Sequence, residues 1–286
     1  MPELMCESPL ASIVDVPETA TVVSCVQETP DIFTLELKLS SPADEKFVYA
    51  PGQFNMLSLY GVGEVPISIV SDPEDELIAH TIRSVGRVTN GLKQLKVGDQ
   101  LGLRGPFGRG WPINASMNKD VVIVTGGLGC APVVSVIHYI IRRKSDFGRL
   151  IIFQGVKHAA DLIWKTQYET WAAIPGVDVR VAASESSNAS WPWYSGHVTN
   201  MISDFDYDQE NSVAMMCGPE PMMLAAIHAL KDKNLYDENI YLSMERSMQC
   251  ALGHCGHCQL GSKFICQQGP VFSYSEIKDL LGKRGL

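Results

Sequence analysis

The sequence lacks an excess of positive charge, a long apolar run and a signal-like amino terminus. Its 286 residues contain 23 Lys and Arg against 32 Asp and Glu, which gives a formal net charge of −9. Because nucleic-acid binding requires a basic surface, this balance argues against DNA or RNA as a partner. No apolar run approaches the roughly 20 residues of a membrane span, and the acidic start, residues 1–7, has no basic-then-apolar layout. We therefore expect no membrane insertion and a cytoplasmic location.

Cysteine is present but unevenly distributed. Of eight cysteines, Cys6, Cys25, Cys130 and Cys217 are scattered, whereas the other four fall within residues 250–266. In a reducing compartment, clustered cysteines bind metal or do redox chemistry more often than they form disulfides. The scattered four are expected to be small buried hydrophobic residues.

Two kinds of hydrophobic pattern divide the chain near residue 114. Before that point, short apolar or alternating runs separated by turns predict an antiparallel β-barrel or sandwich, with strands at 21–26, 32–39, 53–59, 65–70, 77–85 and 101–103. After it, buried apolar strands alternate with helical stretches, which predicts a doubly wound α/β domain with a parallel sheet. Its strands are expected at 121–124, 150–154, 177–182 and 213–217, and its helices at 133–141, 162–173 and 221–231. Three units follow: 1–114, 115–240 and a small segment at 241–286.

A glycine-rich turn joins the first parallel strand to the first long helix. It contains Gly126, Gly127 and Gly129. Such glycines let the backbone approach a pyrophosphate, and the helix start supplies free N–H groups, although this kind of turn is also common for purely structural reasons. A second turn, residues 217–222, follows a later strand of the same domain. Both turns would lie at the carboxyl edge of the sheet, where ligands bind, so a nucleotide site is favoured.

The clustered cysteines have the spacing C-x4-C-x2-C-x7-C. They are Cys250, Cys255, Cys258 and Cys266. Four thiolates satisfy a [2Fe–2S] cluster, and this spacing is the plant-type ferredoxin pattern with a shortened last interval. A zinc site of four cysteines usually pairs two C-x2-C knuckles, and only one is present. His254 and His257 raise a Rieske-type alternative, which four suitable cysteines make unnecessary.

Together these features resemble the ferredoxin–NADP reductase superfamily, whose members pair a flavin-binding antiparallel barrel with a nucleotide-binding α/β domain. The resemblance extends from about residue 18 to about residue 275. The Pro-Ile-Ser-Ile sequence at 66–69, the segment 244–261 and the Gly-Pro-Val-Phe sequence at 269–272 are most similar to the gamma subunits of cytoplasmic nickel–iron hydrogenases, or sulfhydrogenases. The electron-transfer subunit of dihydroorotate dehydrogenase and a subunit of anaerobic sulfite reductase are also similar.

The resemblance implies residues for the nicotinamide nucleotide, NAD(H) or NADP(H). The first turn would line it with Gly126, Gly127, Gly129, Ala131 and Pro132. The second turn would place Cys217, Gly218 and Pro219 beside the nicotinamide ring, with Cys217 as the catalytic candidate. The alternative for Cys217 is a buried cysteine at the end of a strand.

The resemblance also implies a flavin, FAD rather than FMN, held by Pro66, Ile67 and Ser68. Ser68 matches the serine of the superfamily's Arg-x-Tyr-Ser motif, but Val65 stands where the phosphate-binding arginine is expected. Arg83 can replace that charge; the alternative is an ordinary surface arginine on a strand. Further main-chain and hydroxyl contacts are expected from its neighbours, Thr81, Ile82, Gly86, Val88 and Thr89.

The function implied is that of a diaphorase-type electron-transfer subunit. NAD(P)H would pass a hydride to FAD in the barrel, which would release single electrons to the [2Fe–2S] segment and then to other subunits of a redox complex. A nickel–iron hydrogenase is the preferred partner, and sulfite reductase or dihydroorotate dehydrogenase are alternatives. A non-catalytic binding subunit with a structural zinc site is an alternative of another class.

Nucleotide choice depends on the residues after the third parallel strand, 183–188. Glu185 would favour NAD by bonding the ribose hydroxyls and repelling a 2′-phosphate, whereas Ser184, Ser186 and Ser187 could serve a phosphate. The sequence favours NAD slightly.

Overall fold

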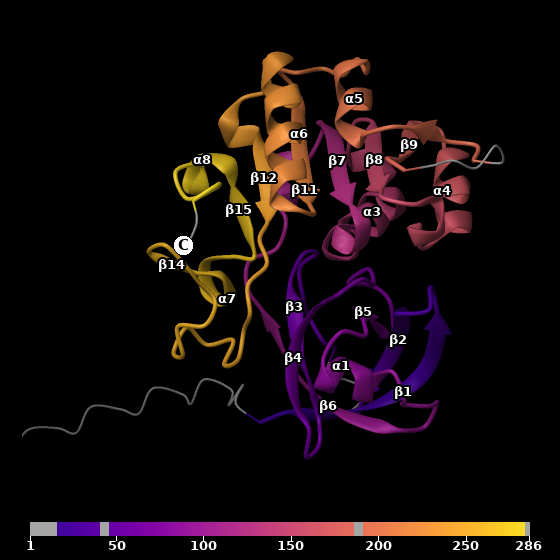
Figure 1. Ribbon diagram of the computed structural model, residues 1–286, viewed down its shortest axis with the longest axis vertical. Helices are drawn as coiled ribbons and strands as arrows, with labels where there is room; N and C mark the ends of the chain where they lie inside the picture. Colours follow the sequence, from indigo (N-terminus) through magenta and orange to yellow (C-terminus); the bar gives the residue numbers. More distant parts are fainter. Residues whose placement is uncertain (1–15, 41–45, 186–190, 284–286) are drawn as a thin grey trace, which may run out of the picture.

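The computed structural model describes residues 16–40, 46–185 and 191–283. Figure 1 shows an antiparallel β-domain beside an α/β domain, with the carboxyl-terminal segment along one side of both. Cys6 and the serines at 186 and 187 lie outside the described residues. Within those ranges, no helix combines the length and apolar character that crossing a membrane requires.

The first domain is a six-stranded antiparallel sheet in the order β4-β3-β6-β1-β2-β5. The strands are β1 (Glu18–Gln27), β2 (Ile32–Leu39), β3 (Phe54–Leu59), β4 (Gly63–Ser68), β5 (Ile78–Arg83) and β6 (Gln100–Phe107). Alternate residues of β2, Phe33, Leu35 and Leu37, are fully buried in the core of this domain, because successive side chains of a strand point to opposite faces. The predicted antiparallel flavin-type domain is confirmed, and it is called the barrel below.

The second domain has a seven-stranded sheet in the order β10-β9-β8-β7-β11-β12-β15. Its strands are β7 (Asp120–Gly126), β8 (Leu150–Val156), β9 (Val177–Ala183), β10 (Tyr194–Ser195), β11 (Ser212–Cys217), β12 (Ile240–Ser243) and β15 (Val271–Ser273). All neighbours pair in parallel except β12 and β15. This mostly parallel sheet confirms the predicted α/β fold.

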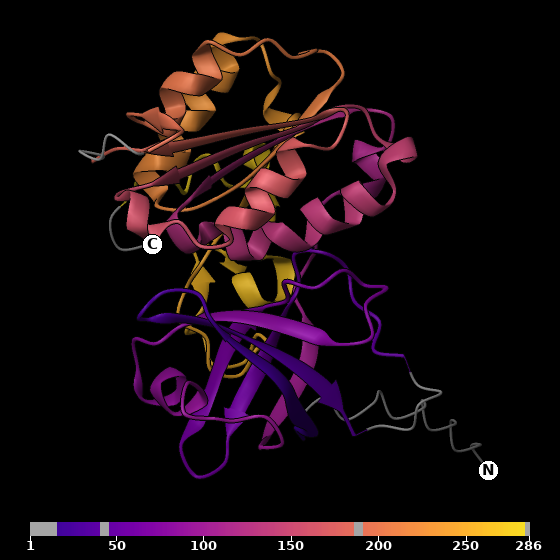
Figure 2. The same cartoon turned by 90° about the vertical axis from the view of Figure 1, so that its right-hand side faces the viewer.

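Helices cover both faces of this sheet (Figure 2). The main helices are α3 (Ala131–Arg142), α4 (Lys165–Ala172), α5 (Val198–Ser203) and α6 (Glu220–Asp232). On β7, Val121 and Ile123 pack with α3 and α4, whereas Val122 and Val124 pack with α5 and α6. A strand buried on both sides reads as a continuous apolar run, which is why it was predictable from the sequence.

The carboxyl-terminal segment contains short elements: β13 (Gln259–Leu260), β14 (Lys263–Phe264), α7 (Ile265–Gln268) and α8 (Tyr274–Ile277). Arg109, just after β6, ties this segment to the barrel side. Its Nε donates to the Val271 carbonyl at 2.8 Å, and its guanidinium pairs with Glu276 at 2.6 Å. Although burial opposes it, this pairing and the Ser273 N–H lower the pKa of Glu276 to about 2.

The two main domains meet through polar contacts at the start of α3. The Trp111 Nε1 donates to the Pro132 carbonyl at 2.8 Å, and the Gly52 N–H donates to the Ser135 hydroxyl at 3.2 Å. Gly52 has a φ of +96°, and a Cβ there would lie 2.6 Å from the Trp111 ring. These contacts fix the amino-terminal end of α3 over the barrel.

The elements predicted from periodicity are present with modest shifts at their ends. The helices and strands that were not predicted are α1 (Arg87–Leu92), α2 (Ile113–Ser116), α5, α7, α8, and the short strands β10 and β12–β15. Each is at most six residues long, so a period of 2 or 3.6 cannot be established over its length.

Candidate functional site

A pocket lies where the barrel, the first nucleotide turn and the carboxyl-terminal segment meet. From the barrel it is lined by Phe54, Val65, Pro66, Ile67, Ser68, Thr81, Ile82, Arg83, Val85 and Thr89. From the α/β domain and the segment after β12 it is lined by Leu128, Ala131, Pro132, Met244, Glu245, Arg246, Met248 and Pro270. The structure thus brings together most of the predicted flavin residues and two of the predicted nucleotide residues.

Ser68 ends β4 and is held from behind by a buried histidine. The His80 Nδ1 donates to the Ser68 carbonyl at 2.9 Å, and the Asn55 amide lies 3.3 Å from Nε2 of the same ring. Burial lowers the pKa of His80 to about 4, so the ring is neutral at physiological pH. His80 was not predicted as a site residue, and its only signal in the sequence was a polar residue at an inward-facing position of β5.

Arg83 ends β5 at the mouth of the pocket, where its side chain is 45% exposed and lies 3.5 Å from Asp31. Val65, which replaces the expected arginine, also lines the pocket. Arg83 is therefore the barrel's basic side chain at this site, as the flavin phosphates would require.

The turn after Arg83 is closed by Thr89. Its hydroxyl accepts the N–H groups of Val85 at 3.0 Å and Gly86 at 2.9 Å. Gly86 and Val88 belong to this turn but are not among the residues that line the pocket. Thr89 thus orders the turn beside the pocket.

The two nucleotide turns are in direct contact. A Cβ on Gly129 would lie 2.4 Å from the Cys217 carbonyl oxygen, and a Cβ on Gly218 would lie 3.0 Å from the Gly126 nitrogen. Likewise, a Cβ on Gly126 would meet Pro219 at 3.0 Å. Glycine at these positions permits the two loops to pack backbone to backbone at the carboxyl edge of the sheet.

Cys217 is the last residue of β11 and is 1% exposed. Burial raises the pKa of its thiol well above the ordinary value, so the sulfur stays protonated at neutral pH. A protonated thiol is a poor nucleophile. Its position beside the first turn suits contact with a bound ring rather than covalent chemistry.

Glu245 is a site residue that was not predicted from the sequence. It follows β12 and lines the same pocket as Arg83. Its side chain is exposed to solvent on one side, and protein surrounds the rest of it. This desolvation raises the pKa of the carboxyl, and the charge of Arg83 opposes the shift. The charge pair Glu245-Arg246, just before the first clustered cysteine, was the available signal.

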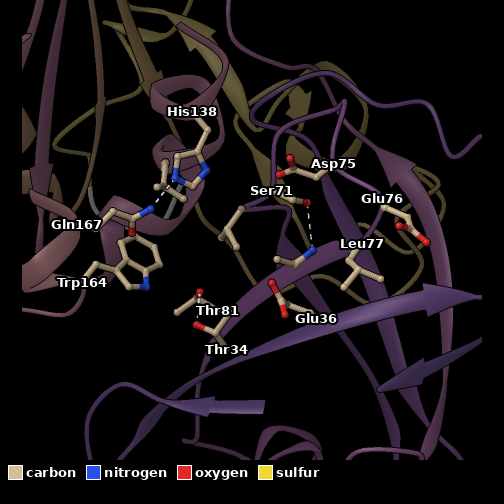
Figure 3. A pocket seen from close by; sticks show the side chains of 13 residues that line it. Thr34, Glu36, Ser71, Asp75, Glu76, Leu77, Thr81, His138, Trp164 and Gln167 are labelled. Carbon is tan, nitrogen blue, oxygen red and sulfur yellow. Dashed lines mark hydrogen bonds between the residues drawn. The ribbon is translucent and has the colours of Figure 1, made fainter. Parts of the chain in front are cut away.

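A second hollow lies at the domain interface on the other side of Thr81 (Figure 3). In it the His138 and Gln167 side chains meet at 2.7 Å. Three carboxylates line its barrel wall: Glu36, Asp75 and Glu76. Since none of the described residues lining it is a lysine or arginine, this hollow is poorly suited to phosphates. The first pocket, with Arg83 and Arg246, suits a dinucleotide better.

Glu185 follows β9, at the same carboxyl edge of the sheet as the glycine turns and two strands away from β7. Its carboxylate lies 3.5 Å from Nζ of Lys157 and 3.9 Å from Nδ1 of His158, both of which follow β8. An acid and two basic groups therefore stand together where the adenosine ribose was predicted to bind. Lys157 and His158 were not foreseen.

The four clustered cysteines form two side-chain pairs. The Cys255 side chain contacts Cys250, and the Cys258 side chain contacts Cys266. In the described residues, no three His, Cys, Asp or Glu side chains are arranged to hold one metal ion. A two-iron cluster takes two thiolates on each iron, and two pairs fit that requirement.

The loop between Cys250 and Cys255 supplies N–H groups to sulfur. The Leu252 and His254 N–H groups donate to Cys250 Sγ at 3.3 and 3.4 Å, and the Gly253 N–H donates to Cys266 Sγ at 3.2 Å. Burial raises the pKa of Cys250, but these main-chain donors and Cys255 outweigh it and lower the value to about 6. Burial and the Cys258 thiol raise the pKa of Cys266 to about 12.

Comparison with known proteins identifies two families in the chain. Residues 123–228 match the oxidoreductase NAD-binding domain, and residues 245–278 match the iron–sulfur cluster binding domain of dihydroorotate dehydrogenase B. Sulfhydrogenase 1 subunit gamma of Pyrococcus furiosus is 33% identical over 261 residues, 89% of each chain. A probable dihydroorotate dehydrogenase B (NAD(+)) electron transfer subunit of the same organism is 33% identical over 233 residues, 82% of this chain and 83% of the relative.

The chain belongs to the ferredoxin–NADP reductase-like family with a dihydroorotate dehydrogenase B-type iron–sulfur domain. It is therefore an oxidoreductase of an FAD- and NAD(P)-binding family, as predicted from the sequence. Solved structures agree on the fold of this family. A structure of an NADH-dependent reduced ferredoxin–NADP oxidoreductase superposes with a TM-score of 0.71 at 23% identity, covering 92% of this chain and 91% of that chain.

A ferredoxin–NADP⁺ reductase from Neisseria gonorrhoeae with bound FAD and NADP superposes with a TM-score of 0.64 at 19% identity. It covers 75% of this chain and 90% of that chain. The similarity of fold thus extends over three quarters of this chain.

Proposed function

We propose that this chain is a diaphorase-type subunit that moves electrons between NAD(P)H, FAD and a [2Fe–2S] cluster for a partner enzyme. One observation carries the proposal. Met244, Glu245, Arg246 and Met248 line the flavin-type pocket, and the first clustered cysteine, Cys250, follows two residues later. The same short segment therefore connects the two redox sites.

The residues have distinct proposed roles around FAD. Pro66, Ile67 and Ser68 would hold the ring system, with His80 fixing the main chain behind Ser68. Arg83 would pair with the phosphates. A flavin held by these residues would supply the conversion between a two-electron hydride and single electrons.

The nicotinamide nucleotide would bind along the contact between the two glycine turns. Gly126, Gly127 and Gly129 would let its pyrophosphate approach the backbone at the start of α3. Gly218 and Pro219 would keep the second turn close, and the neutral thiol of Cys217 would border the nicotinamide. Glu185 supports a preference for NAD(H).

A [2Fe–2S] cluster on Cys250, Cys255, Cys258 and Cys266 is supported by the paired thiols and by the N–H donors around them. The test is the visible absorption, iron content and EPR signal of the anaerobically purified protein. Cys255→Ser should abolish the cluster signal. Cys25→Ser, at an exposed cysteine on β1, is the matched control. A colourless protein with bound zinc and no flavin would instead support the structural zinc alternative.

The proposed partner is a cytoplasmic nickel–iron hydrogenase. The similarity to sulfhydrogenase gamma subunits supports this choice, since two of them are 33% and 34% identical over 89% of the chain. The dihydroorotate dehydrogenase electron-transfer subunits that match over 90% and 92% of the chain are 29% and 30% identical. Sulfite reductase and dihydroorotate dehydrogenase are the alternatives. Purification of the native complex decides between them: co-purifying nickel and NAD(P)H-linked hydrogen turnover are expected, and a nickel-free partner would contradict the hydrogenase assignment.

A further inference from the structure

A largely buried ion pair lies in the barrel next to the cysteine segment. Arg104 on β6 and Glu64 on β4 form two hydrogen bonds, 2.6 Å from Nη2 to Oε2 and 2.8 Å from Nε to Oε1. Their side chains are only 7% and 21% exposed, and Glu64 also accepts the Ser58 hydroxyl at 2.7 Å. Because burying two charges carries a desolvation cost that their attraction often only balances, stability alone is a weak explanation for such a pair.

The same guanidinium reaches the cysteine segment. Nη2 of Arg104 donates to the main-chain oxygen of Cys250 at 3.3 Å, across 146 positions of sequence. The side of the molecule around the pair is hollowed, and Arg104, Glu64, Cys250 and Leu252 all line that groove. A barrel cation is therefore in direct contact with the first proposed cluster ligand.

Arg104 also faces the flavin side of the barrel. Its guanidinium lies 5.4 Å from the centre of the Phe107 ring, which is 5.8 Å from the ring centre of Phe54. Phe54 lines the flavin-type pocket. Arg104 thus stands between the two redox sites and contacts the cluster side through a polar bond.

Charge near an iron–sulfur cluster changes its reduction potential, because each added electron makes the four-thiolate centre more negative. A cation beside a ligand favours the reduced form, and an anion favours the oxidised form. In the Arg104–Glu64 pair these effects oppose each other, with the cation in contact with Cys250. Removing either partner alone therefore leaves the opposite charge beside the cluster.

We propose that Arg104 and Glu64 are positioning residues that hold Cys250 against the barrel and set the reduction potential of the cluster. This inference rests on the proposed function, since it needs a cluster at Cys250. Its distinctive consequence is a pair of potential shifts with opposite signs, which a merely structural role would not produce.

The test is an anaerobic redox titration of the full chain with its cofactors, followed by the EPR signal of the cluster. Glu64→Gln should raise the potential, and Arg104→Gln should lower it. The double variant should return towards the wild-type value, and Arg104→Lys, which keeps the charge, should stay close to it. Iron content per chain confirms that each variant retains its cluster.

Arg149→Gln is the matched control. Arg149 pairs with Asp120 at 3.1 Å and lies 5.9 Å from the Phe205 ring, so it has the same kinds of contact. It lies just before β8, at the opposite edge of the sheet from the glycine turns, and its loss should leave the potential unchanged.

Three outcomes are decisive. Equal or same-sign shifts in Glu64→Gln and Arg104→Gln, with intact clusters, would overturn the inference and leave the proposed function standing. A wild-type protein without an iron–sulfur signal would overturn the proposed function itself. If Arg104→Gln loses the cluster, the test uses the other two single variants: Glu64→Gln should raise the reduction potential and Arg104→Lys should leave it unchanged. If Glu64→Gln does not raise the potential, the inference is overturned.

Discussion

The Nδ1 atom of His80 lies 2.9 Å from the main-chain oxygen of Ser68, so a fully buried imidazole fixes the strand end that carries the proposed flavin serine. The ring is not itself a pocket-lining residue. The ring acts on the site through the backbone. Because it is fully buried, it cannot be protonated without disturbing the barrel.

His80 should make stability depend on pH. Burial lowers its pKa from 6.5 to about 4, so between those values the unfolded chain binds the proton and the folded chain does not. The free energy of unfolding is therefore unaffected by the titration of His80 above pH 6.5. It falls by on the order of 3 kcal/mol as the pH drops to 4. In urea unfolding at pH 4 to 8, His80→Gln should flatten this part of the profile.

The control for this experiment is His228→Gln, at an exposed histidine on α6. It shows whether loss of any histidine alters the profile. If His80→Gln and wild type lose unfolding free energy in parallel between pH 6.5 and 4, the buried ring is not the titrating group.

The Arg83 side chain should contribute directly to flavin affinity. A charge-assisted hydrogen bond to phosphate is worth about 1.5–3 kcal/mol, so Arg83→Gln should weaken flavin binding roughly 10- to 100-fold. Fluorescence titration of the apoprotein with FAD measures this loss. Arg87→Gln, at an exposed arginine four residues later, should bind FAD as tightly as the wild type does. If Arg83→Gln also binds FAD with the wild-type affinity, Arg83 makes no phosphate contact.

Much of this fold was predictable because its main strands are long enough to show a period. The run at β7 and the alternation in β2 both follow from which faces are buried. The cysteine spacing likewise identified the metal-binding segment, because four thiols close in sequence in a reducing compartment usually bind metal.

The supporting contacts were not predictable from the sequence. Arg104 and Glu64 are 40 positions apart, and they meet only because β4 and β6 flank β3 in the sheet. Glu245 shares a pocket with Arg83 only because the segment after β12 passes the barrel. A single sequence shows which residues carry charge, but tertiary packing decides which of them meet.

The contact between the two glycine turns should be sensitive to a single methyl group. A Cβ on Gly129 would lie 2.4 Å from the Cys217 carbonyl oxygen, a backbone atom that cannot move independently. We expect Gly129→Ala to push the turns apart, to destabilise the protein by about 1–3 kcal/mol and to raise the KM for NAD(P)H. Thermal unfolding and steady-state kinetics with an artificial acceptor measure the two effects.

Gly61→Asn serves as the comparison for this variant. Gly61, between β3 and β4, has a φ of +73°, and a Cβ there would have no neighbouring atom within 4 Å; asparagine tolerates this conformation better than most residues. The variant should therefore keep a KM near the wild-type value. A similar rise in KM in both variants would mean that the effect of Gly129→Ala does not come from separating the two glycine turns.

Glu185 should control the choice between NADH and NADPH. Its carboxylate lies 3.5 Å from Lys157 and 3.9 Å from His158, so it both repels a 2′-phosphate and occupies the nearby basic groups. Glu185→Ser removes the repulsion and releases Lys157 to bind phosphate. The ratio of kcat/KM for NADPH to that for NADH should rise by about tenfold, or about 1.4 kcal/mol. Glu210→Gln, at an exposed acid before β11, should leave the ratio unchanged, and an unchanged ratio in Glu185→Ser would place the adenosine ribose elsewhere.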